Sequence, residues 1–121
     1  MSAQKQANWS YTEGLPVEDD VLLRARDRSH ELGVAPVTTG IAAALTVLAA
    51  ASKAMTVVEV GAGAGVSGVC LLRGMGPNSV LTTIDSDVDH LRAAPRPTPR
   101  RESPRTAPEQ SPAAQPTCFP A

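Results

Sequence analysis

The chain has 121 residues, enough for one small domain, and it contains only one Trp, one Tyr and one Phe, so its core must consist mainly of Ala, Val and Leu. Its net charge of −1 divides into −3 over residues 1–94 (seven Lys/Arg against ten Asp/Glu) and +2 over residues 95–121 (four Arg against two Glu). Neither charge is typical of a nucleic-acid-binding protein.

Other features bound the class of protein. The two cysteines, Cys70 and Cys118, lack the spacing of a metal site, and we expect free thiols in a reducing cytoplasm. The N-terminal residues lack the apolar stretch of a secretory signal. The longest apolar run, near residues 41–51, is too short to span a bilayer, which takes about 20 residues. We therefore expect a cytoplasmic protein without a membrane segment.

Two helices are predicted in the first half of the chain. The first covers about residues 17–32: Pro16 suits a first helical position, acidic residues follow it, and Gly33 provides the end. Its arginines are expected to lie mostly outside the apolar face, which is formed by Val21, Leu22, Ala25, Ser29 and Leu32. The second covers about residues 40–53 and is capped by Thr38 or Thr39.

A strand–helix–strand unit is predicted next. The β-branched run Thr56–Val60 indicates a buried strand, and its lack of alternation favours coverage of both faces. A helix over about 65–74 and a second strand at Val80–Ile84 follow, and a third helix begins at Asp87 and is cut short after Ala94. This order predicts an α/β fold built on parallel strands.

The remaining residues, 95–121, hold eight of the eleven prolines and almost no large apolar side chain. Such a segment buries too little surface to offset its chain entropy, so we expect a disordered Pro/Arg-rich tail after a folded unit of residues 1–94. The alternative is that residues Pro97–Arg101 form a proline-rich motif of the PxxP type, which a partner protein would bind.

A glycine-rich loop joins the first strand to its helix. Glycines let the backbone approach a ligand closely, and the helix start presents free N–H groups. Gly61 and Gly63 fit the dinucleotide spacing, but Val66 stands where that pattern requires glycine or alanine. Asp85 follows the second strand and can accept hydrogen bonds from the hydroxyls of a ribose, so it indicates a ribose-containing cofactor without showing which one. The alternative interpretation of Asp85 is a turn residue that caps the next helix.

The spacing instead gives Glu59-x-Gly61-x-Gly63-x-Gly65, which resembles motif I of the class I S-adenosylmethionine (SAM)-dependent methyltransferases. Over residues 9–94 the chain is similar to the N-terminal half of small actinobacterial O-methyltransferases of the catechol/caffeoyl-CoA type. The segments that carry this resemblance are 11–14, 22–26, 33–38 and 71–85. The resemblance implies a Rossmann-like domain that transfers a methyl group from SAM to a small-molecule hydroxyl.

The same resemblance implies a cofactor site. Val37 would cover the methionine end, Glu59 would lie under the glycine loop, Ser67 would bond the methionine carboxylate, and Asp85 would take the ribose hydroxyls. The backbone at Gly61 and Ala62 would contact the ligand directly. The full set of cofactor-binding residues implied is Val37, Glu59, Gly61, Ala62, Gly63, Ser67 and Asp85.

The family's metal carboxylates would follow the second strand, where this chain has no acidic cluster, so a divalent metal is expected only in a full-length form. No catalytic residue is assigned, and we expect His30 and His90 to be surface residues. We interpret the abrupt change after Ala94 as a frameshift or premature end of a longer methyltransferase; the competing hypothesis is a natural tail. On this view the chain is catalytically impaired or inactive.

Two other functions stay open at this level. One is a non-catalytic module that docks on a full-length homologue, which includes association as a homo- or heterodimer. The other, disfavoured by Val66, is one half of an NAD-type Rossmann domain.

Overall fold

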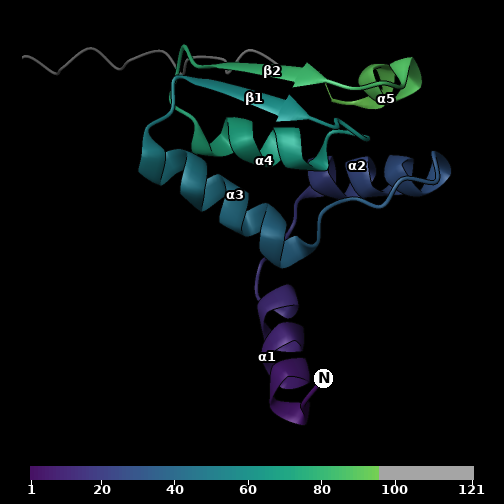
Figure 1. Cartoon of the computed structure of the whole chain (residues 1–121), viewed down its shortest axis with the longest axis vertical. Helices are drawn as coiled ribbons and strands as arrows, with labels where there is room; N and C mark the ends of the chain where they lie inside the picture. The colour runs from purple at the N-terminus through teal and green to yellow at the C-terminus, as the bar shows by residue number, and fades with distance from the viewer. Residues whose placement is uncertain (96–121) are drawn as a thin grey trace, which may run out of the picture.

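Two parallel strands lie along one side of the molecule, and their connecting helix packs against them (Figure 1). The computed structural model describes residues 1–95. The elements in chain order are α1 (Ala3–Gly14), α2 (Asp20–Glu31), α3 (Thr39–Ser52), β1 (Thr56–Val60), α4 (Val66–Gly74), β2 (Val80–Ile84) and α5 (Val88–Ala93). The parallel register pairs Thr56 with Val80 and Val60 with Ile84. The α/β prediction, including the bounds of both strands, is confirmed.

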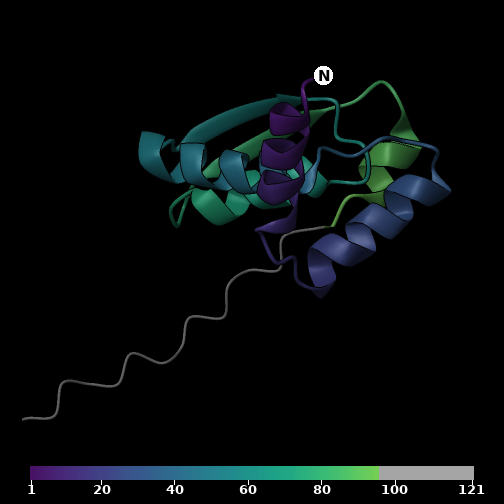
Figure 2. The ribbon, with the colours of Figure 1, turned by 90° about the horizontal axis from the view of Figure 1, so that it is seen from below.

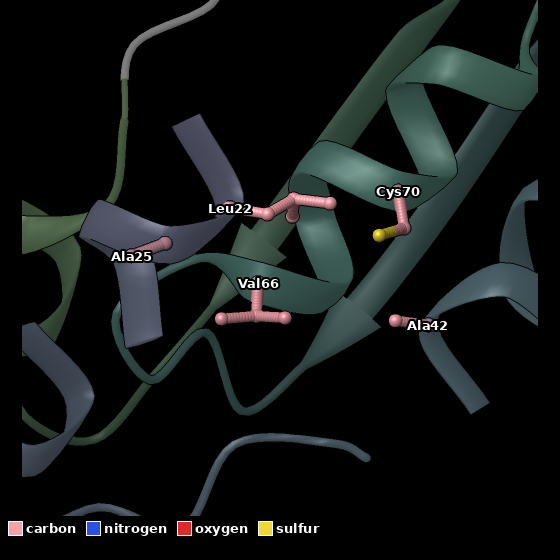
Figure 3. Packing of buried hydrophobic residues seen from close by; sticks show 5 residues of the cluster. All are labelled: Leu22, Ala25, Ala42, Val66 and Cys70. Carbon is pink, nitrogen blue, oxygen red and sulfur yellow. The ribbon is translucent and has the colours of Figure 1, made fainter. Parts of the chain in front are cut away.

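The small core lies between α2, α3 and α4. Figure 3 shows its buried cluster, in which Leu22 and Ala25 of α2 and Ala42 of α3 surround Val66 and Cys70 of α4. The helices approach closely because their contact residues are small. A β-carbon on the final residue of α4, Gly74, would lie 2.1 Å from the Thr46 carbonyl oxygen of α3.

The two faces of the sheet differ. Helices α3 and α4 lie on one face (Figure 1), and there the carboxylate of Glu59 meets α4 at Gly68, where a β-carbon would be 3.1 Å from Glu59 Oε2. On the other face Val58 and Val60 are 61% and 83% exposed. The prediction that both faces of this strand are covered is therefore wrong for the described residues, because Glu59 lies inward with the half-buried Val57, whereas Val58 and Val60 lie outward.

Helix α2 begins later than predicted. The side chain of Asp19 accepts a hydrogen bond from the Leu22 N–H at 3.2 Å, so the helix starts at Asp20 and Pro16 lies before it. Leu22, Ala25 and Ser29 are buried, as the pattern predicts. Arg26 contradicts the pattern: only 18% of its side chain is exposed, because Glu18 and a backbone carbonyl take up its donors.

Helix α1 was not expected from the sequence. It is capped by Ser2, buries none of its residues and extends away from the other helices (Figure 1). Its link to the rest runs through Glu13, which accepts hydrogen bonds from the Thr38 hydroxyl at 2.7 Å and the Gly40 N–H at 3.0 Å. The same two donors lower the pKa of Glu13, the Gly40 N–H having the larger effect.

The end of the described chain is α5, which Asp87 caps by accepting from the Asp89 N–H. The predicted disordered tail, apart from Pro95, and the proline-rich alternative lie outside the described residues. Within residues 1–95, no helix is long and apolar enough to cross a membrane.

Candidate functional site

The loop between β1 and α4 folds back on the end of β2. Gly61 and Gly63 have φ of +92° and +47°, backbone conformations that side chains disfavour. The Gly61 N–H donates to the Ile84 carbonyl at 2.7 Å, which fixes the loop beside the residue that follows β2.

That residue, Asp85, is the most heavily hydrogen-bonded side chain of the site. Its Oδ2 accepts from the N–H groups of Ala62 at 2.7 Å and Gly63 at 3.1 Å, and its Oδ1 accepts from the Asp87 N–H at 2.9 Å. The ring Nδ1 of His90 lies 3.2 Å from Oδ1. The Asp87 N–H, followed by those of Gly63 and Ala62 and by His90, lowers the pKa of Asp85 to about 2. The carboxylate is therefore ionised at neutral pH.

Glu59 lies in β1, just before the loop, with its side chain between the strands and α4. It is 9% exposed, and its carboxylate accepts hydrogen bonds from the hydroxyls of Ser67 at the start of α4 and Thr83 of β2. Because a serine hydroxyl has a single proton, Ser67 is committed to Glu59 in this structure.

A cavity of about 290 Å³ lies beside the loop. The glycine-loop wall, residues 61–64, forms one side of it. Residues 34–37, which belong to no helix or strand and are here called the Val34–Val37 wall, line it as well. Both strands point toward the end of the molecule where α2 and α5 lie (Figures 1 and 2), so this cavity is at the carboxyl end of the sheet. That end is the usual ligand position in open α/β sheets.

Most predicted site residues meet at this cavity. Those that line it are Val37, Gly61, Ala62, Gly63, Ser67 and Asp85. Glu59 does not line the cavity and instead accepts a hydrogen bond from Ser67, which does.

His90 was missed by the sequence reasoning. It lines the cavity with only 20% of its side chain exposed, whereas a surface position was expected. The available signal was its spacing: it lies five residues after Asp85, in the first turn of α5, which directs the ring back to the carboxylate. The imidazole can hold Asp85 or meet a ligand in the cavity.

The acidic residues after β2 do not make a metal site. Residues 1–95 contain no group of three or more His, Cys, Asp or Glu side chains that could hold a metal ion. Asp87 is 52% exposed and caps α5, whereas Asp89 is 68% exposed and pairs with Arg92. The donor set present in the described part therefore does not fit a hard cation.

No protein-family model matches the chain. A protein of Mycobacteroides abscessus classed as an O-methyltransferase is 49% identical over 89 residues, a match that covers 74% of this chain and 41% of that protein. The chain is homologous to part of an O-methyltransferase. It spans about two fifths of the length of such relatives.

Solved structures agree with this homology in their fold. The O-methyltransferase TomG of Streptomyces achromogenes, in complex with SAM, has a TM-score of 0.67 at 24% identity, over 78% of this chain and 44% of TomG. An O-methyltransferase of Bacillus cereus, in complex with S-adenosylhomocysteine (SAH), has a TM-score of 0.65 at 19% identity, over 74% of this chain and 41% of the other. The described part thus shares the Rossmann-like fold of part of these O-methyltransferases, as the motif predicts.

Proposed function

We propose that this chain binds SAM in the cavity beside the glycine loop. It would be the cofactor-binding part of an O-methyltransferase that methylates a small-molecule hydroxyl. One observation carries the proposal: an ionised, hydrogen-bonded Asp85 and the glycine loop line the same cavity as Val37. The homology to O-methyltransferases and the SAM and SAH of two structural relatives support the choice of ligand.

In this proposal Asp85 recognises the ribose. A carboxylate accepts the hydroxyl protons of a vicinal diol, and its low pKa keeps it in the accepting form. The N–H groups of Ala62 and Gly63 fix the direction of the carboxylate. The backbone of the glycine-loop wall would then lie directly against the cofactor.

Ser67 and Val37 serve the methionine end of SAM in this proposal. Ser67 is near the start of α4, where a ligand carboxylate is favoured by free N–H groups and the helix dipole. To donate to that carboxylate its hydroxyl must turn away from Glu59. SAM supplies an electrophilic methyl group to the acceptor oxygen, and the acceptor site and methyl transfer belong to the whole enzyme, of which the chain spans about two fifths.

Calorimetric titration of the 121-residue chain with SAM, SAH and NAD tests the proposal. We expect heat of binding with SAM and SAH and none with NAD, because Val66 replaces the small residue of the dinucleotide pattern and is buried in the core. Ser67→Ala should weaken SAH binding. Ser52→Ala, which removes a hydroxyl bonded to the Ala49 carbonyl in α3, is the matched control and should bind as wild type. Heat with NAD alone would overturn the proposal.

A further inference from the structure

The Val34–Val37 wall has no helix or strand of its own, so other elements must hold it. The Val34 N–H donates to the Ser29 carbonyl at 2.8 Å, and Pro36 has no N–H to donate. The carbonyl of Val37 accepts from Arg26 Nη1 of α2 at 2.8 Å. Arg26 is thus the side chain that holds the wall at Val37.

Arg26 is itself fixed by an ion pair. Its Nε and Nη2 donate to the two carboxylate oxygens of Glu18 in a fork, and the side chains are only 18% and 9% exposed. The hydrogen bonds that Arg26 donates to Glu18 raise the pKa of Arg26. All three guanidinium nitrogens are therefore used, two to fix the plane and one to hold the wall.

Stability alone does not explain this arrangement. Burying an ion pair costs desolvation that often cancels its attraction, so apolar residues of similar size can be as stable or more so. A planar guanidinium, in contrast, fixes direction, since a lysine ammonium cannot form the fork and reach a carbonyl with defined geometry. The pair joins Glu18, which precedes α2, to Val37 at the end of the cavity wall.

We propose that Arg26, oriented by Glu18, is a positioning residue that sets the affinity for SAM by holding Val37 against the cavity. This inference rests on the proposed function, since it concerns the same cavity. Arg26 does not line the cavity, so it acts only through the wall.

The test is SAH affinity in Arg26→Lys and Glu18→Gln, measured by calorimetry on the whole chain alongside thermal unfolding. Loss of one charge-assisted hydrogen bond predicts about tenfold weaker SAH binding for Arg26→Lys. Glu18→Gln keeps the size of the side chain but frees the plane of the guanidinium, and we expect a loss of about threefold. It also serves as the second variant if Arg26→Lys does not fold.

Arg73→Lys is the matched control. Arg73 pairs with Asp19 at 2.7 Å, but those side chains are 36% and 55% exposed and Arg73 does not line the cavity. We expect its SAH affinity to equal that of wild type. Wild-type affinity in a folded Arg26→Lys or, if that variant is unfolded, in Glu18→Gln would overturn the positioning role while leaving the proposed function intact. Failure of the wild-type chain to bind SAM or SAH would overturn both.

Discussion

The glycine-loop wall and the Val34–Val37 wall line one cavity but are held by different means. Backbone N–H groups hold the first to Asp85, a carboxylate that immediately follows the neighbouring strand. Side chains from two helices hold the second wall. Glu13 of α1 contacts Thr38, the residue that follows this wall, and Arg26 of α2 contacts the Val37 carbonyl. A motif in the sequence marks the first kind of wall, whereas the second depends on tertiary packing.

The largest expected effect comes from removing the carboxylate of the glycine-loop wall. In Asp85→Asn one accepting oxygen becomes a donor that faces N–H groups, so both the loop and the proposed ribose contact suffer. We expect SAH binding to weaken about a hundredfold by calorimetry, which corresponds to two charge-assisted hydrogen bonds.

Asp89→Asn provides the control for that change. Asp89 is 68% exposed and pairs with Arg92, which is 74% exposed, so loss of the Asp89 charge should leave SAH affinity unchanged. Equal weakening in the two variants would show that charge near α5, and not the Asp85 contact, determines binding.

The two walls of the cavity approach each other at Gly63 and Val34. Gly63→Ala places a β-carbon at φ of +47° and 3.3 Å from Val34 Cγ1. The backbone conformation alone costs about 1–2 kcal/mol, and we expect at least this decrease in the free energy of unfolding by urea. Adding Val34→Ala should recover part of the loss if the walls are in contact. No recovery would mean that backbone conformation accounts for the whole effect.

Only part of the site could be predicted from the sequence. Gly61, Gly63 and Asp85 were found because a β-branched run, a glycine loop and an acid after the next strand follow one another in the chain. His90 and Arg26 were missed because polar residues on a helix predict an exposed face, and only the packing of α2 and α5 turns them inward.

The fold, too, could be predicted only in part. The bounds of β1 and β2 were predicted because each is a short β-branched run bounded by turn residues. Helix α1 gave no apolar pattern because it buries no residue. The start of α2 was placed at a proline, although Asp19 supplies the cap three residues later. Coverage of β1 was misjudged because Val58 and Val60 face away from α4 in the described chain.

A smaller effect is expected at the other wall. Glu13→Gln keeps the size of the side chain but removes the charge that accepts from Thr38 and Gly40. We expect about threefold weaker SAH binding, because only the end of the Val34–Val37 wall loosens. Glu31→Gln, an exposed change in α2, is the control. Binding of SAH as tight as in wild type would indicate that α1 does not support this wall.

The smallest effect is the acid dependence of folding. Asp85 has its pKa lowered from 3.8 to about 2, so the stability that it contributes is fully present above about pH 4 and is lost as the pH falls toward 2. Urea unfolding between pH 2 and 6 should show a steeper acid loss for wild type than for Asp85→Asn. Parallel pH profiles would contradict the lowered pKa.

The most direct test of the central claim is a titration of the ¹⁵N-labelled chain with SAH, followed by amide NMR shifts. We expect the shifts to concentrate at the amides of Gly61–Ala64 and of Val34 and Val37, on both walls of the cavity. The amides of α1, which buries no residue, should stay unchanged. Saturating SAH that moves none of the wall amides, or moves only those of α1, would contradict that claim.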